Sequence, residues 1–187
     1  MTHFHPGNVI SRHSLHSTHG TTVEIPHPTQ LTHLQFRRFA GCPVCNLRIH
    51  EFFDRYTDLV DHHIQEVAVF QSSDEIMNTR LAEAPFPLIA DTDRVLYEEF
   101  GVESSLPAML NPRMLPATVK GMWQHGVRLP EAVDAAFTLP AEFLIDCAGN
   151  VVAAKYGKHY DDQWDVDELI RLADAETLHS HDQAQQG

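Results

Sequence analysis

The stretch that decides the fold is LTHLQFRRFAGCPVC, residues 31–45. Its first part, residues 31–39, is rich in aliphatic and aromatic side chains and is predicted to be a strand that stops at Gly41. From Pro43 to about His62, apolar residues recur at the spacing of a helix with one buried face, and proline suits the first helical position. Cys42 and Cys45 therefore lie where a predicted strand ends and a predicted helix begins.

Strand and helix signals alternate on both sides of this unit. The expected strands are a hairpin at 14–18 and 22–25 around Gly20, followed by 64–71, 86–90, 141–146 and 151–156. One helix is expected to begin near Ser72, and two others are expected over 91–100 and 165–177. A further candidate helix lies at 113–123. This order predicts an α/β fold with a central mixed β-sheet, helices on both faces and an N-terminal β-hairpin.

Length and composition limit the classes of function. With 187 residues, of which 43% are hydrophobic, we expect a single domain over residues 1–178 and a disordered tail over 179–187. The net charge of -13 repels phosphate backbones and anionic lipids, so neither nucleic acid nor a membrane is an expected partner. The sequence has no apolar run of ~18 residues and no secretion-signal pattern at its start, which makes the cytoplasm the expected compartment.

The cysteine pair has a spacing that suits redox chemistry. Residues three apart on a helix share a face, at a separation that a disulfide tolerates. Cys42 would meet free backbone N–H groups and the positive end of the helix dipole, so it is the candidate nucleophile. Cys45, in the first turn, is the candidate resolving thiol, which attacks a mixed disulfide or a sulfenic acid on Cys42.

Zinc binding and an inert core pair are the plainer interpretations of this CxxC. A zinc site usually takes a second pair of ligands, and neither Cys147 nor the scattered histidines have that spacing, so no metal is expected. Inert buried cysteines are common, but less so where a strand meets a helix N-terminus. Cys147 is expected to be a bystander, with a role as a distant resolving thiol as the alternative. There is no GxGxxG or P-loop motif, so no nucleotide cofactor is expected either.

Three blocks in a fixed order carry a family resemblance: FRRFAGCPVC at 36–45, FPLIADTDRVLYEEFGV at 86–102 and LPAEFLIDCAGNVVAAKYG at 139–157. Together they resemble the peroxiredoxin-like branch of the alkyl hydroperoxide reductase and thiol-specific antioxidant (AhpC/TSA) superfamily, over roughly residues 6–173. The resemblance implies a thioredoxin-like three-layer α/β/α sandwich with Cys42 at the position of the peroxidatic cysteine. It also implies a disulfide or peroxide substrate, a thioredoxin- or glutathione-type reductant and pairing as a homodimer.

Three positions depart from the pattern of true peroxiredoxins. Gln35 and Phe39 stand where the family's PxxxTxxC motif has proline and threonine or serine. Pro140 stands where the family has an arginine before the late strand, and it resembles the cis-proline that lies beside the CxxC of thioredoxins. Loss of both the hydroxyl and the arginine would remove transition-state stabilisation for peroxide reduction.

Two other arginines are candidates to supply the missing charge. Arg38 lies four residues before Cys42, and Arg48 lies about one helical turn after Cys45. The alternative is that both lie on a solvated edge or pair with Glu51 and nearby Asp54.

The leading hypothesis is a thiol-disulfide oxidoreductase with an antioxidant role. In it the candidate site residues are Cys42, Cys45, Pro140 and Arg38. One alternative is a thiol peroxidase that forms a sulfenic acid on Cys42. The other is a redox-sensing or binding module that changes a partner surface without turnover.

Overall fold

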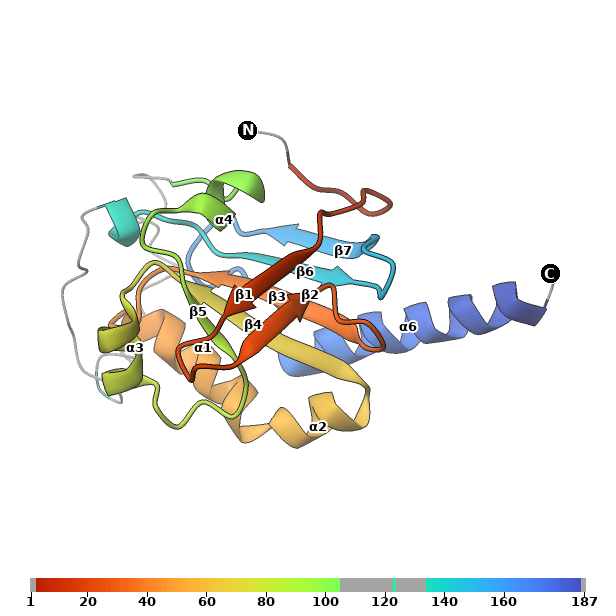
Figure 1. Ribbon diagram of the computed structural model, residues 1–187, viewed down its shortest axis with the longest axis horizontal. Coiled ribbons are helices and arrows are strands. Elements are labelled where there is room, and N and C mark those ends of the chain that lie inside the picture. The colour runs from red at the N-terminus through yellow and green to blue at the C-terminus, as the bar shows by residue number, and fades with distance from the viewer. Residues whose placement is uncertain (1–2, 105–122, 124–133, 186–187) are drawn as a thin grey trace.

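Strand β3 (Leu31–Arg37) is the middle strand of a five-stranded sheet in the computed structural model, which describes residues 3–104, 123 and 134–185. The strand order is β5-β4-β3-β6-β7 (Figure 1). Strands β3, β4 and β5 run parallel, whereas β6 is antiparallel to β3 and to β7. The remaining strands of the sheet are β4 (Ile64–Phe70), β5 (Leu88–Ala90), β6 (Ala141–Ile145) and β7 (Val151–Tyr156).

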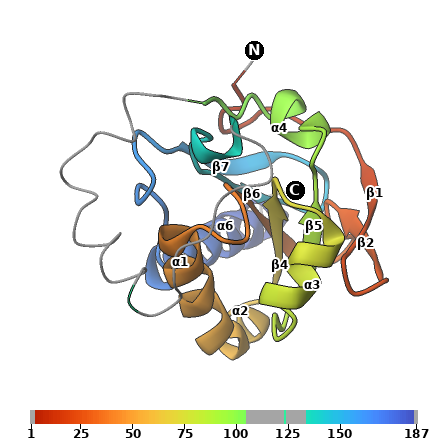
Figure 2. The same cartoon turned by 90° about the vertical axis from the view of Figure 1, so that its left-hand side faces the viewer.

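The two faces of this sheet are covered differently (Figure 2). One face packs against the helices α1 (Pro43–Asp54), α2 (Tyr56–Asp61), α3 (Asp74–Arg80) and α6 (Val166–Gln185). The other face is covered by the short helix α4 (Val95–Glu99) and by the antiparallel hairpin β1 (His13–His16) and β2 (Thr22–Ile25). The predicted α/β/α sandwich, with its central mixed sheet and N-terminal hairpin, is confirmed.

Two apolar cores separate the three layers. The core under α1 contains Phe52, Leu59 and Phe70 together with both cysteines of the CxxC. The core under the hairpin is aromatic, since Phe36, Phe100, Phe143 and Tyr97 meet there with ring centroids 5.1–5.9 Å apart. Burial of such rings is a major source of folding free energy, so both layers are anchored on β3 and its neighbours.

Several boundaries differ from the sequence-based expectations. The helix predicted over 43–62 is divided at Arg55, whose backbone (φ -111°, ψ 18°) leaves the helical region and separates α1 from α2. The helix predicted over 165–177 continues through Gln185, into the stretch expected to be a disordered tail. The candidate helix at 113–123 lies outside the described residues, apart from its last position.

Candidate active site

Cys42 lies beyond the carboxyl end of β3, at the N-cap of α1. Backbone contacts fix the short connection that carries it: the Gln71 N–H donates to the Arg38 carbonyl at 2.8 Å, and the Cys42 N–H donates to the Phe39 carbonyl at 2.9 Å. The Ala40 N–H donates to Ser72 Oγ at 3.0 Å. The connection is therefore tied to the end of the parallel neighbour β4, and the sulfur has a defined position.

The Cys42 sulfur accepts two hydrogen bonds. One comes from Arg38 Nη2 at 2.7 Å and the other from the Cys45 backbone N–H at 3.2 Å, which caps the helix. Cys42 is 0% exposed and Cys45 is 2% exposed, and neither forms a disulfide. Charge-assisted donors on a buried sulfur stabilise its thiolate form.

Arg38 is itself held from two other directions. Its Nη1 donates to the Ala136 carbonyl at 3.2 Å, and its guanidinium carbon lies 3.7 Å from the centroid of the Tyr160 ring. Burial alone would lower the pKa of Arg38, but the negative charges of Cys42 and Cys45 outweigh it and raise that pKa. The guanidinium therefore stays charged beside the two sulfurs.

The two thiols titrate as an interacting pair. Burial acts to raise the pKa of both, and the hydrogen bond between the two sulfurs splits them. That hydrogen bond, with the charge of Arg38, lowers the pKa of Cys45, while the pKa of Cys42 is raised. The pair thus loses its first proton easily and its second with difficulty. Formation of a Cys42 thiolate requires the proton to leave Cys42, whose sulfur is in direct contact with the Arg38 guanidinium.

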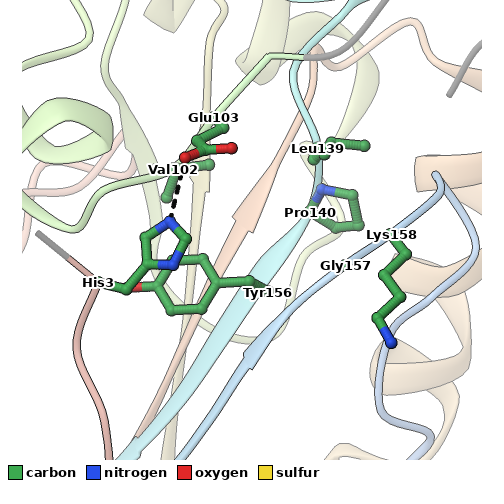
Figure 3. Close-up of a pocket in the computed structure, with 8 residues that line it drawn as sticks. All are labelled: His3, Val102, Glu103, Leu139, Pro140, Tyr156, Gly157 and Lys158. Carbon is green, nitrogen blue, oxygen red and sulfur yellow. Dashed lines mark ion pairs between the residues drawn. The ribbon is translucent and has the colours of Figure 1, made fainter. Parts of the chain in front are cut away.

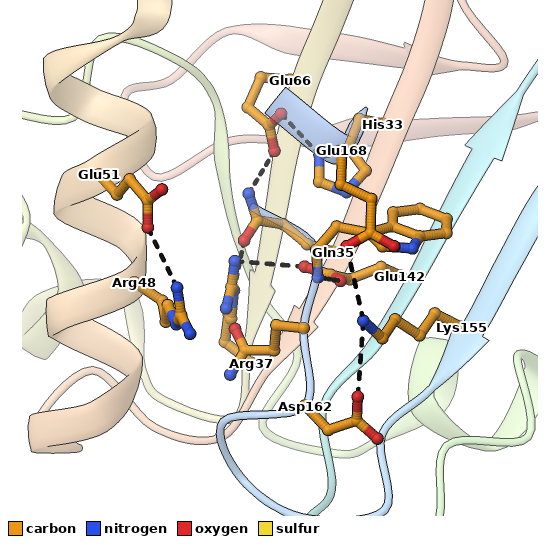
Figure 4. A network of polar contacts seen from close by, with 12 residues as sticks. His33, Gln35, Arg37, Arg48, Glu51, Glu66, Glu142, Lys155, Asp162 and Glu168 are labelled. Carbon is orange, nitrogen blue, oxygen red and sulfur yellow. Dashed lines mark hydrogen bonds and ion pairs between the residues drawn. The ribbon is translucent and has the colours of Figure 1, made fainter. Parts of the chain in front are cut away.

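A buried chain of polar side chains runs along the same face of the sheet (Figure 4). Arg37 Nη2 lies 3.5 Å from Glu142 Oε1, and Glu142 Oε2 accepts the Trp164 N–H at 2.5 Å. The positive charge of Arg37 also lowers the pKa of Cys45, after the larger influence of Arg38. The other links in this network of polar side chains are hydrogen bonds from Arg37 Nε to Gln35, from Gln35 Nε2 to Glu66 and between Glu66 and His33.

Pro140 differs from its expected role. Within the described residues only the Ile25–Pro26 peptide is cis, so the bond before Pro140 is trans and the expectation of a cis-proline is wrong. Pro140 lies in the wall of a separate cavity of about 240 Å³, with Tyr156, Gly157 and His3 (Figure 3). Its carbonyl accepts the Gly157 N–H at 2.8 Å, which fixes the entry to β6 against the end of β7.

The remaining candidates have structural partners. Arg48 is paired with Asp161 at 2.7 Å and with Glu51 at 3.3 Å, as the alternative interpretation expected for Glu51. Cys147 donates to the Gln30 carbonyl at 3.3 Å, and burial and then Asp146 raise its pKa, which makes it a poor nucleophile. The structure therefore brings Arg38, Cys42 and Cys45 together.

Sequence reasoning missed Tyr160, Ala136 and Arg37. Ala136 contributes only its carbonyl, which no residue type would reveal. Tyr160 belongs to the loop after β7, more than a hundred residues from Cys42, and no spacing motif connects the two. Arg37 lies in the strand predicted over 31–39, and a charged residue inside a run of apolar residues is the one signal available for it.

Two features are absent from the described part of the chain. Its side chains contain no cluster of three or more His, Cys, Asp or Glu residues able to hold a metal ion. None of its helices combines the length and apolar character that crossing a membrane requires.

Comparison with known proteins identifies the family of this chain. The model of the AhpC/TSA family matches residues 6–154, more than half of the chain. A search of curated proteins finds no significant match.

Similar solved structures share the fold over nearly the whole chain. The peroxidoxin BcpB from Mycobacterium tuberculosis has a TM-score of 0.64 at 16% identity, covering 92% of this chain and 98% of that one. A PrxQ mutant from Xylella fastidiosa has a TM-score of 0.67 at 15% identity, covering 96% and 99%. The reduced 2-Cys peroxiredoxin from Plasmodium vivax has a TM-score of 0.67 at 15% identity, covering 95% and 84%. These TM-scores establish a common fold.

Proposed function

Since the chain belongs to the AhpC/TSA family of thiol-dependent oxidoreductases, we propose that it reduces hydrogen peroxide or a small alkyl hydroperoxide at Cys42. The observation that carries this proposal is the contact of 2.7 Å between Arg38 Nη2 and the fully buried Cys42 sulfur. A peroxide needs positive charge and hydrogen-bond donors directed at its breaking O–O bond. Arg38 supplies them from the residue before Phe39, in place of the arginine that the family has at the position of Pro140.

The burial of both sulfurs favours a small oxidant over a protein disulfide. With 0% and 2% exposure, neither sulfur lies on a surface that a folded disulfide partner can reach without rearrangement. The trans bond before Pro140 also removes the feature that suggested a thioredoxin-like docking groove. For these reasons the peroxidase replaces the disulfide oxidoreductase as the leading hypothesis.

The proposed reaction has two steps in the protein. The Cys42 thiolate attacks one peroxide oxygen, an S–O bond forms as the O–O bond breaks, and the sulfur becomes a sulfenic acid while water or an alcohol leaves. The Cys45 thiolate then attacks the Cys42 sulfur, forming an S–S bond and releasing the sulfenic oxygen as water. A thioredoxin-type dithiol, or two glutathione thiols in turn, then reduces the disulfide and leaves in the oxidised form, which takes a rearrangement that exposes the 42–45 disulfide. The three free cysteines suit a reducing compartment such as the cytoplasm.

Trapping of the intermediate tests this assignment. In a Cys147→Ser background, we expect Cys45→Ser to accumulate a sulfenic acid on Cys42 that a dimedone-type probe labels. The protein with Cys147→Ser alone should form a disulfide between Cys42 and Cys45. Stopped-flow oxidation by hydrogen peroxide should proceed at least a hundredfold faster than oxidation of a free thiol. A rate equal to that of a free thiol would exclude the peroxidase.

Thiol–disulfide exchange is the second candidate. The hydrogen bond between the two sulfurs supports it, because the pair is already arranged to close a disulfide. A reductase-coupled assay with a small disulfide and with hydrogen peroxide as alternative oxidants distinguishes the two reactions. Oxidation that occurs once and is never turned over by a thioredoxin or glutathione system would instead favour the redox-sensing module.

A further inference from the structure

Tyr160 is fixed beside the redox site by its loop. Its side chain is 3% exposed, and its ring stacks on the Arg38 guanidinium with 3.7 Å between the guanidinium carbon and the ring centroid. The next residue, Asp161, accepts a hydrogen bond of 2.7 Å from Arg48 of α1. The loop that carries Tyr160 is therefore clamped to the helix that begins at Cys42.

The Tyr160 hydroxyl is a buried donor without a hydrogen-bond partner in the described part of the chain. Burial without a hydrogen bond costs such a group its contacts with water. Burial raises the pKa of Tyr160, Arg38 opposes this change, and the negative charges of the two sulfurs add to it. The hydroxyl thus lies within electrostatic range of the sulfurs, and Arg38 is the side chain that it interacts with most strongly.

We propose that the Tyr160 hydroxyl is the proton donor to the leaving oxygen of the peroxide, an inference that rests on the proposed peroxidase function. As the Cys42 thiolate attacks, the O–O bond breaks and two electrons pass from sulfur to the leaving oxygen. That oxygen takes the Tyr160 proton and leaves as water, or as an alcohol from an alkyl hydroperoxide. Cys42 is left as a sulfenic acid, and the phenolate, beside Arg38, recovers its proton from solvent.

Phe39 and Arg38 cannot supply this proton, whereas Cys45, which is hydrogen-bonded to Cys42, is the rival donor. Phe39, at the position of the family's threonine or serine, has no donor, and a guanidinium is not deprotonated in proteins. A phenol is a far stronger acid than water, so proton transfer to the departing hydroxide is favourable. Positioned acids of this kind contribute roughly a hundredfold or more to rate.

Tyr160→Phe isolates the hydroxyl, because it keeps the ring stacked on Arg38. In a Cys147→Ser background, we expect the stopped-flow rate constant of Cys42 oxidation by hydrogen peroxide to fall on the order of a hundredfold. Peracetic acid releases acetate, a carboxylate that needs no proton at neutral pH since carboxyl groups have pKa values of ~4. With that oxidant the same variant should lose less than about threefold, a difference that a structural role would not produce.

The matched control is Tyr156→Phe. The Tyr156 hydroxyl donates to the Phe100 carbonyl at 2.7 Å and accepts the Phe4 N–H at 2.8 Å. Its removal should lower the melting temperature and leave both oxidation rates unchanged, whereas Tyr160→Phe should keep the melting temperature of the parent. If Tyr160→Phe lost the same factor in rate with both oxidants, or lost no rate with hydrogen peroxide, Tyr160 would not be the proton donor. The proposed peroxidase function would be unaffected by that result. A parent protein that reacts no faster than a free thiol would overturn the peroxidase function as well.

Discussion

The two faces of β3 are opposites in chemistry although they belong to the same seven residues. On the side of the hairpin, Leu34 and Phe36 enter an aromatic core. On the side of α1, the alternating residues are His33, Gln35 and Arg37, all of them buried. His33 stacks on Phe52 with 5.5 Å between ring centroids, and the Arg37 guanidinium carbon lies 5.7 Å from the centre of the same ring.

This difference follows from what each face supports. On the hairpin face, Leu34 and Phe36 meet apolar and aromatic partners, so this part of the face depends on shape and buried area. The α1 face supports a pair of thiols that carries negative charge without access to water, and an arginine nearby stabilises that charge. A buried arginine in turn needs carboxylate and amide partners, because an unpaired charge in a protein interior costs several kcal/mol. The chain through Gln35 and Glu142 supplies those partners.

The largest expected effect comes from breaking the polar face at Arg37. We expect Arg37→Met to lower the free energy of unfolding by about 3–5 kcal/mol, since it leaves the Glu142 carboxylate buried and unpaired. It should also raise the pKa of Cys45, because the charge of Arg37 lowers that pKa in the parent. Urea unfolding and thiolate absorbance as a function of pH measure the two effects.

A substitution on the opposite face provides the control for Arg37→Met. Phe36→Leu should cost only about 1.5 kcal/mol, as a change between apolar residues, and should leave thiol titration unchanged. If the two variants behaved alike in both measurements, the two faces would not differ in function.

The next effect concerns the contact with the sulfur. Arg38→Met should reduce the rate constant for oxidation by hydrogen peroxide by about 10²–10³, the usual consequence of removing one preorganised donor. Because Arg38 lowers the pKa at which the pair loses its first proton, its loss should move the pH–rate profile to higher pH. Arg55→Met is the control, since Arg55 makes only surface ion pairs with Asp58 and Asp167. A profile that stays in place would show that the sulfurs do not depend on Arg38.

The contrast between the faces also explains what the sequence can and cannot predict. Alternation of strands with helices and the strand-to-helix junction at Cys42 depend on local pattern, and both are found in the structure. Arg38 was found by its distance of four residues from Cys42. The partners of the polar face come from β4, β6 and the loop before α6, and Tyr160 and Glu142 are brought to β3 only by the tertiary fold. Pro140 was misread because a proline in the sequence does not specify its peptide isomer.

The smallest effect concerns the pH dependence of folding. Burial raises the pKa of Glu142, opposed first by Arg37 and then by His33. A carboxyl with a raised pKa binds more protons in the folded than in the unfolded state, so its contribution to stability is complete below the unfolded value of ~4.5 and is lost as pH rises through the folded pKa. The loss amounts to about 1.4 kcal/mol for each unit of the shift.

Glu142→Gln should therefore have a flatter curve of unfolding free energy against pH from about 4.5 upward than the parent. The exposed Glu75→Gln should keep the parent curve, because that side chain meets solvent in both states. Parallel curves for Glu142→Gln and the parent would mean that burial of the Glu142 carboxylate does not lower the free energy of unfolding. The two faces of β3 would then differ in composition but not in the pH dependence of stability.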